Sequence, residues 1–278
     1  MDKGILYGVG VGPGDPELLT IKALKVIKEC DAIALPVSGT ADKTQITAYQ
    51  IVWKIYPEID KKRIIFLCMP MIKDKKALQQ VHAEGAEQVC RKLDKGENVA
   101  FLTLGDVSIY STFLYIQKLV EASGYETRVI PGVPSFCAAA AALKTGLGEM
   151  GDSIHILPGS YDISEGMELS GTKILMKSGS KIGQVKEELK KYDSQIQMVT
   201  NCGMEEEQIY HSLDEIPEQA GYYSLIIAKE GEKRCWGRTW SRRSDYRPGA
   251  EIINGSRPGD LCRIAGESRI TKVLQRKL

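Results

Sequence analysis

GVGVGPGDPELLT, residues 8–20, is the most informative segment of this chain of 278 residues. Its first half continues an apolar run that begins at residue 4, and a short apolar run punctuated by glycine predicts a buried strand. After the turn, Leu18, Leu24 and Ile27 recur with the spacing of one helix face. The chain is therefore expected to open with a strand, a glycine-rich loop and a helix.

The glycine loop at residues 8–14 differs from the dinucleotide-binding fingerprint. Glycines let a backbone turn tightly and approach a ligand, but the sixth position of G-x-G-x-x-G falls on Pro13 or Asp15. The helix is expected after the prolines, with Asp15 as N-cap and Pro16 at the first helical position. An acidic N-cap opposes phosphate binding. The loop is thus either an ordinary strand-to-helix turn or one wall of a ligand cleft.

The rest of the chain repeats the alternation of strands and helices. Strands are expected at 31–35, 63–68, 98–104, 126–130, 153–157, 172–176, 195–200 and 222–228, and helices at 44–55, 76–94, 111–122, 134–143 and 181–191. This alternation predicts an α/β fold with mainly parallel sheets covered by helices. Because the glycine-rich stretch at 145–152 is typical of a linker, two α/β domains are expected, at 1–150 and 151–232.

Two further loops follow predicted strands, LGDVSIY at 104–110 and PGVPS at 131–135. In open parallel sheets, ligands bind beyond the carboxyl ends of the strands, so both loops should reach the crevice formed by the first. Asp106 has two interpretations, a helix cap or an acceptor for ribose hydroxyls or an amino group. The small residues at 137–142 favour either close packing on a sheet or room for a flat ligand.

Composition and charge exclude several classes of protein. Hydrophobic residues make up 43% of the chain, charged residues make up 26%, and no apolar stretch approaches the roughly 18 residues of a membrane span. A net charge of +1 predicts no general attraction to nucleic acid or to anionic membranes. The seven cysteines are scattered without a Cys-x-x-Cys pair, so we expect reduced thiols. The absence of a secretory signal pattern at the start favours the cytoplasm.

The last 45 residues differ from the others in their basic residues. Residues 1–233 contain 3 arginines and 23 lysines, whereas residues 234–278 contain 9 arginines and 2 lysines. We interpret the tail at 233–278 as a late appendage or frameshift-derived extension without a part in the chemistry. Its basic cluster, interleaved with Trp236 and Trp240, would suit an anionic macrocycle or nucleic acid, but an exposed irregular segment is the favoured interpretation.

The three loop sequences GVGVGPGDPELLT, LGDVSIYS and VIPGVPSF occur in the order and spacing of the tetrapyrrole methylases, and residues 1–232 resemble that family. Within it, the chain most resembles the enzymes that methylate carbon 20 of precorrin-2 or cobalt-factor II in cobalamin biosynthesis. GDVSIYSTF, PSFCAAAA, HILPG and ILMKSG carry this closer resemblance. The resemblance implies two α/β domains, S-adenosyl-L-methionine held between them as methyl donor, a tetrapyrrole substrate and a homodimer.

The same resemblance implies which residues contact the cofactor. They come from all three loops and from two segments of the second domain: Pro13, Leu104, Gly105, Asp106, Ile109, Pro134, Ser135, Met176 or Lys177, and Cys202. The family often has threonine or serine where this chain has Pro134. A hydroxyl contact is therefore not expected at Pro134, and Ser135 is the better candidate.

No catalytic residue and no metal site are predicted. Methyl transfer from a sulfonium is an in-line displacement on an activated carbon, so the enzyme mainly aligns the reactants. A general base would help carbon 20 lose its proton, but the sequence singles none out. His155 is expected in a strand, while His82 and His211 are expected at the surface. A substrate with eight carboxylates needs lysine or arginine partners, and which ones serve is left open, as is the choice between metal-free and cobalt-bearing substrate.

Other functions share parts of this pattern. A nicotinamide-dependent oxidoreductase would have the glycine loop, but the strict fingerprint and its acidic residue after the second strand are missing. A tetrapyrrole carrier or sensor would bind without catalysis. Within the superfamily, methylation at another ring position or of a protein, as in diphthine synthesis, is the alternative, whereas an RNA substrate fits poorly with a net charge of +1.

Overall fold

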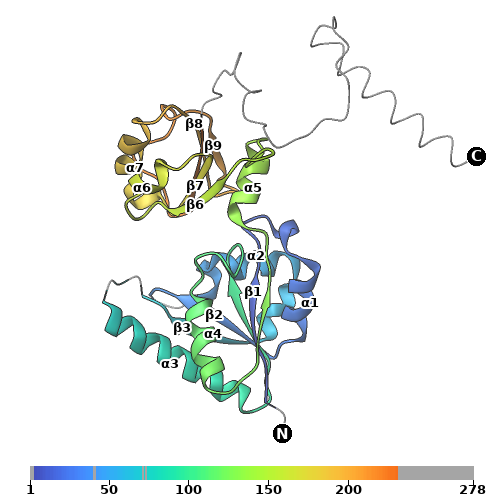
Figure 1. Cartoon of the computed structure of the whole chain (residues 1–278). Helices are drawn as coiled ribbons and strands as arrows, with labels where there is room; N and C mark the ends of the chain where they lie inside the picture. The colour runs from blue at the N-terminus through green and yellow to red at the C-terminus, as the bar shows by residue number, and fades with distance from the viewer. Residues whose placement is uncertain (1–2, 40–41, 71, 73, 231–278) are drawn as a thin grey trace, which may run out of the picture. The chain divides into compact units, whose positions relative to one another are not determined.

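The computed structural model describes residues 3–39, 42–70, 72 and 74–230 (Figure 1). They form two sheets with helices packed on them, and both sheets belong to one compact unit, Met1–Gly231. The arginine-rich tail at 233–278 lies outside the described residues. Within the described part, no helix has both the length and the apolar character that crossing a membrane requires.

The first sheet contains five parallel strands in the order β3-β2-β4-β1-β5. Its strands are β1 (Leu6–Gly10), β2 (Ala32–Val37), β3 (Arg63–Cys68), β4 (Val99–Thr103) and β5 (Thr127–Ile130). The connecting helices are α1 (Ile21–Glu29), α2 (Thr47–Ile55), α3 (Lys75–Leu93) and α4 (Phe113–Ala122), with short 3-10 turns η1 (Pro16–Leu18), η2 (Lys43–Gln45) and η3 (Pro57–Lys61). Parallel strands place their carboxyl ends at one edge, so the loops after β1, β4 and β5 meet there.

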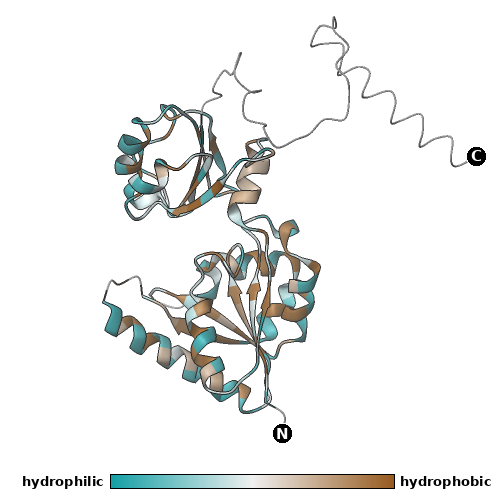
Figure 2. Ribbon diagram, in the orientation of Figure 1, coloured by the Kyte–Doolittle hydropathy of each residue, from teal (hydrophilic) through white to brown (hydrophobic). Residues whose placement is uncertain are grey.

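Alternating side chains along each strand divide the first core into two layers. On β4, Val99 and Phe101 pack with α3 and α4, whereas Ala100 and Leu102 pack with α1 and α2. Because both faces are covered, the central strands are apolar throughout, as expected for a buried parallel sheet. The two helix layers lie on opposite faces of the sheet (Figure 1), and Figure 2 shows hydrophobic strands beneath helices whose outer faces are hydrophilic.

The second sheet has the order β6-β7-β10-β8-β9. Its elements are α5 (Ser135–Ala142), β6 (Ile154–Pro158), α6 (Ser164–Met167), β7 (Thr172–Met176), η4 (Gly179–Lys181), α7 (Ile182–Leu189), β8 (Ser194–Thr200), β9 (Gln208–Tyr210) and β10 (Ser224–Glu230). β6 and β7 pair in parallel, but β10 runs antiparallel to β7 and β8, and β9 runs antiparallel to β8.

The predicted α/β class, with mainly parallel sheets, is confirmed, since five of the eight strand pairings among the described residues are parallel. The second sheet departs from it because β10 inserts between β7 and β8 from the opposite direction. The helix expected to complete the first unit, α5, instead packs on the second sheet, where Ala139 and Ala140 contact a core that includes Ile174, Val199 and Ile227. Its alanines therefore serve close helix-on-sheet packing.

Candidate functional site

The loops after β1 and β4 pair with each other through their backbones. The Val11 amide donates to the Thr103 carbonyl (2.9 Å), and Gly12 and Gly105 exchange hydrogen bonds of 3.3 and 2.7 Å. Both glycines have left-handed backbone, with φ of 84° and 73°, a conformation that costs other residues free energy. The Gly12 amide thus donates to the Gly105 carbonyl and not to a ligand.

The end of the first loop agrees with the expected cap. The Asp15 carboxylate accepts a hydrogen bond from the Glu17 amide (2.9 Å), and Pro16 occupies the first helical position. However, the capped element is only η1, a single 3-10 turn, and α1 starts at Ile21 behind its own cap, Thr20. A carboxylate therefore stands where a dinucleotide-binding fold would present a bare helix N-terminus to phosphate.

Asp106 joins the second loop to the third. One carboxylate oxygen accepts hydrogen bonds from the amide (2.8 Å) and the hydroxyl of Ser108, and the other accepts one from the Gly132 amide (2.9 Å). Burial raises the pKa of this carboxyl, but hydrogen bonds from Ser108, Gly132 and Val107 outweigh burial and hold the pKa below its usual value. The charged carboxylate is thus favoured, and the link between the loops weakens only as the pH falls below that lowered pKa.

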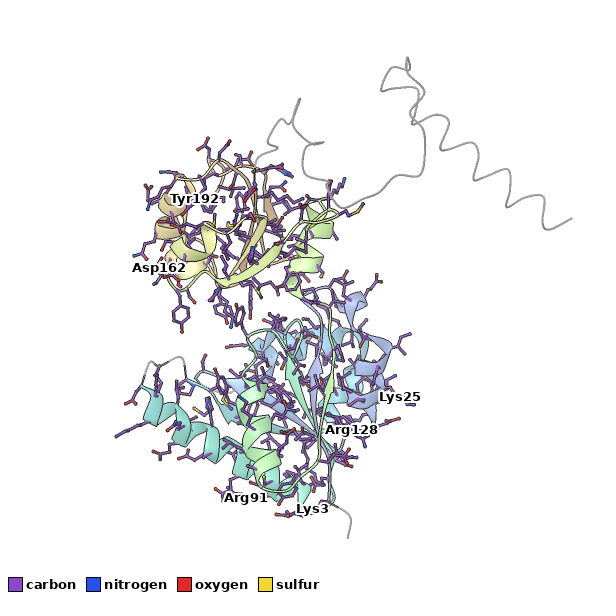
Figure 3. All side chains as sticks on the ribbon, viewed as in Figure 1. Lys3, Lys25, Arg91, Arg128, Asp162 and Tyr192 are labelled. Atoms are coloured by element: carbon purple, nitrogen blue, oxygen red, sulfur yellow. The ribbon has the colours of Figure 1, made fainter. Side chains whose placement is uncertain are left out.

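We expect Asp106→Ala to weaken cofactor binding by about tenfold or more, because each lost hydrogen bond to a charged group contributes about 1.5–3 kcal/mol. Calorimetric titration with S-adenosylhomocysteine measures the change. Asp162→Ala is the matched control, because Asp162 holds the amide and hydroxyl of Ser164 in the same way away from the cavity (Figure 3). Equal affinity of Asp106→Ala and wild type would show that the link between the loops is not needed.

Three glycine backbones pack against one another where the loops meet. A β-carbon on Gly10 would lie 2.6 Å from the Gly132 amide nitrogen, and one on Gly132 would lie 2.2 Å from the Gly105 carbonyl oxygen. Both distances are shorter than any normal contact of a β-carbon. The glycines therefore let the loops after β1, β4 and β5 approach closely.

A cavity of about 560 Å³ is bounded by these loops and by the second sheet. All ten positions implied by the family resemblance line it: Pro13, Leu104, Gly105, Asp106, Ile109, Pro134, Ser135, Met176, Lys177 and Cys202. The charged residues among its described lining are Asp42, Asp106 and Lys177. The volume lies within the range of about 300–1,000 Å³ that is typical of small-molecule sites.

Several lining residues were not predicted from the sequence, among them Thr47, Tyr110, Tyr222 and Tyr223. The Tyr223 and Thr47 hydroxyls lie 3.0 Å apart within hydrogen-bonding distance. Tyr110 is the last residue of the second loop motif, LGDVSIY, so the sequence pattern could have identified it as a lining residue. Tyr222 and Tyr223 precede β10, and a parallel β10 would have placed them at the opposite edge of the sheet from the end of β7. The antiparallel pairing of Leu225 with Met176 brings them to the cavity instead.

Cys202 contributes a protonated thiol to the lining. Burial, the negative charge of Glu207 and a hydrogen bond with Glu207 raise the pKa of the Cys202 thiol to about 12. Thiolates are the reactive form of cysteine. Cys202 is therefore suited to packing against a ligand and not to acting as a nucleophile near neutral pH.

At pH 8 we expect Cys202 to resist iodoacetamide, because only about one thiol in ten thousand is ionised four units below its pKa. The exposed Cys68 and Cys137 should be alkylated first, as peptide mass spectrometry would show. The rate at Cys202 should rise as the pH approaches 12. Alkylation of Cys202 at pH 8 as fast as that of Cys68 would contradict this assignment.

The three histidines lie outside the cavity lining. His155, in β6, places Nε2 2.9 Å from the Ser170 carbonyl oxygen, and His82 stacks on Tyr115 with ring centroids 4.8 Å apart. The His211 amide donates to Glu215 (2.7 Å). Their surroundings give none of them a role at the site.

Comparisons with known proteins agree with the loop motifs. The model of the tetrapyrrole (corrin/porphyrin) methylases matches residues 5–217. A probable cobalt-precorrin-2 C(20)-methyltransferase of Methanocaldococcus jannaschii is 39% identical over 230 residues, which cover 81% of this chain and 95% of that protein. A precorrin-2 C(20)-methyltransferase of Sinorhizobium sp is 27% identical over 243 residues, covering 81% and 94%.

A solved structure shares the fold. The uroporphyrin-III C-methyltransferase from Thermus thermophilus, crystallised with S-adenosylhomocysteine, superimposes with a TM-score of 0.60 at 19% identity, covering 82% of this chain and 98% of that one. The family model spans most of the chain, and the relative that is 39% identical is matched over nearly its whole length. The chain belongs to the tetrapyrrole (corrin/porphyrin) methylases.

Proposed function

We propose that the chain transfers a methyl group from S-adenosylmethionine to the meso carbon 20 of precorrin-2 or cobalt-factor II, in cobalamin biosynthesis. The observation that carries the proposal is the convergence of all ten predicted positions on one cavity in a tetrapyrrole methylase. The relatives that are 39% and 27% identical are both named C(20)-methyltransferases, which supports the ring position.

The lining of the cavity fits S-adenosylmethionine. Leu104, Ile109 and Met176 offer apolar surface for the flat adenine ring, and Asp42 and Asp106 supply negative charge to a ligand that carries a sulfonium. After the first loop, the Asp15 carboxylate caps the helical turn where a dinucleotide-binding fold would hold a phosphate, and this cofactor contains no phosphate. We therefore assign the cofactor to the cavity, with Ser135 as the hydroxyl of the third loop that is available to it.

When bound, this co-substrate supplies a methyl group that is already activated by its positively charged sulfur. The chain's own task is to hold the nucleophilic carbon in line with that methyl group, and alignment of two reactants supplies much of the rate enhancement in such reactions. Asp106 keeps the loops fixed through its hydrogen bonds to Ser108 and Gly132, so the walls of the cavity are set before substrate arrives. We assign the departing proton of carbon 20 to no residue.

Ligand binding and methyl incorporation test the proposed class. We expect tight binding of S-adenosylhomocysteine and no binding of NADH, because the first loop lacks the dinucleotide-binding fingerprint and carries the Asp15 carboxylate at its helical turn. Anaerobic incubation with precorrin-2, or with cobalt-factor II, and cofactor labelled in its methyl group should give a labelled trimethylated product by mass spectrometry. NADH binding would favour an oxidoreductase, and tetrapyrrole binding without label would favour a carrier. The homodimer and the cytoplasmic location stay predictions.

A further inference from the structure

Two strained residues lie together at the cavity. Among the described residues, four that are not glycine have left-handed backbone, and two of these, Tyr110 (φ 49°) and Lys177 (φ 58°), line it. Such conformations cost free energy and persist where the surrounding structure enforces them, often at functional sites. Lys177 directly follows β7, and Tyr110 ends the loop after β4.

Contacts across the cavity hold the Lys177 amine in place. Its Nζ donates to the Tyr110 carbonyl oxygen (3.3 Å) and lies 6.0 Å from the centroid of the Tyr110 ring and 5.8 Å from that of Tyr222. The Tyr110 hydroxyl in turn donates to the Ile156 carbonyl oxygen of β6 (3.1 Å). The ammonium group therefore sits between two aromatic rings at the outer limit of cation–π distance.

Lys177 is the cation among the described residues that line this site. No other lysine or arginine belongs to the described lining, and the basic residues labelled in Figure 3, among them Lys25, Arg91 and Arg128, lie outside it. Within the described part of the chain, no carboxylate comes within 4.0 Å of its amine, and the Tyr110 carbonyl is the acceptor found for it. Because an ammonium has three N–H donors, two are available to a ligand oxygen.

The charge of Lys177 distinguishes the two reactants. S-adenosylmethionine carries a net positive charge despite its one carboxylate, whereas a tetrapyrrole with several carboxylate side chains is strongly negative and is attracted more to the ammonium. Tyr110 and Tyr222 are 44% and 48% exposed, so their side chains can offer apolar surface to the edge of a flat macrocycle beside that charge. We propose that Lys177, between Tyr110 and Tyr222, receives a carboxylate of the tetrapyrrole substrate and positions the macrocycle against the methyl donor. This inference rests on the proposed function. It assigns Lys177 to substrate binding, whereas the family resemblance had implied a cofactor contact at Met176 or Lys177.

The test compares variants that separate charge from backbone strain. Lys177→Gly removes the amine and relieves the left-handed backbone, so lost binding cannot be ascribed to added strain. Lys177→Arg keeps the charge, and Lys190→Met removes a lysine at the end of α7 that is paired with Glu187 outside the cavity. Uroporphyrin III, a stable porphyrin with eight carboxylates, is the binding probe, followed by its absorbance shift, and S-adenosylhomocysteine is titrated in parallel.

We expect Lys177→Gly to weaken porphyrin binding by about tenfold or more, with S-adenosylhomocysteine affinity changed by less than about twofold. Lys177→Arg should keep most of the porphyrin affinity, and Lys190→Met should match wild type. Unchanged porphyrin affinity of Lys177→Gly, an equal loss for both ligands, or no porphyrin binding by wild type would overturn the inference. The binding measurement does not depend on turnover. If the wild type methylates another ring position, the proposed function is refuted, but the effect of Lys177 on porphyrin binding can still be judged.

Discussion

Replacing Gly132 with alanine is expected to lower methyl-transfer activity by about a hundredfold or more. The new β-carbon would lie 2.2 Å from the Gly105 carbonyl oxygen and 2.7 Å from the Gly10 carbonyl carbon, and both are backbone atoms that no side-chain rotation can move away. The loops after β1, β4 and β5 must then separate, and a shift of about 1 Å in a site that aligns two reactants costs about a hundredfold in rate.

Steady-state turnover measures this effect, and thermal melting reports the accompanying strain of about 1–3 kcal/mol. Gly183→Ala is the control, since a β-carbon there, in α7, has no atom within 4 Å and alanine favours a helix. We expect that control to keep full activity and to melt no lower than wild type. Normal turnover of Gly132→Ala would mean that the site does not depend on this close approach.

The second large effect is expected at Gly14, where the first loop touches the second half of the chain. A β-carbon on Gly14 would lie 2.2 Å from the Cys202 carbonyl oxygen and 3.0 Å from Cγ of Met204. Gly14→Ala must therefore push the Cys202 segment away from Pro13, and these two residues line the same cavity. We expect S-adenosylhomocysteine affinity to fall by about tenfold and turnover to fall by about a hundredfold.

The melting temperature of Gly14→Ala should fall as well, because its β-carbon meets a backbone carbonyl oxygen at 2.2 Å, as in Gly132→Ala. Gly146→Ala serves as the control, since its β-carbon would have its nearest neighbour at 4.0 Å. Titration calorimetry and turnover on the same preparations separate binding from alignment. Unaltered cofactor affinity in Gly14→Ala would show that the Cys202 segment does not contact the cofactor.

Local patterns predicted the elements of the first half well, because buried parallel strands and amphipathic helices leave strong periodic signals. The cap formed by Asp15 and Pro16 was also predicted, since a cap depends on residues adjacent in sequence. By contrast, α6 and β9 have only four and three residues, too few to show a period. The direction of β10 depends on which strands it pairs with, and no local pattern encodes that choice.

The same limit applies to the site. Glycine, proline and aspartate at three strand ends indicated where the ligand would bind, because parallel strands share one edge. That Asp106 would bond to the Gly132 amide, 26 residues away, depends on the final packing of two loops. The tyrosines before β10 reach the cavity only through its antiparallel register with β7. These contacts depend on pairing between residues far apart in the sequence, which the spacing of residues along the sequence does not encode.

The position of the transferred methyl group tests the central proposal most directly. Anaerobic incubation of the chain with S-adenosylmethionine carrying a carbon-13 methyl group, and with precorrin-2 or cobalt-factor II, allows the product to be examined by NMR. We predict one enriched methyl group attached to carbon 20 of the macrocycle, formed faster from one of the two substrates. Enrichment at carbon 17, 11 or 12 instead would contradict the proposed ring position.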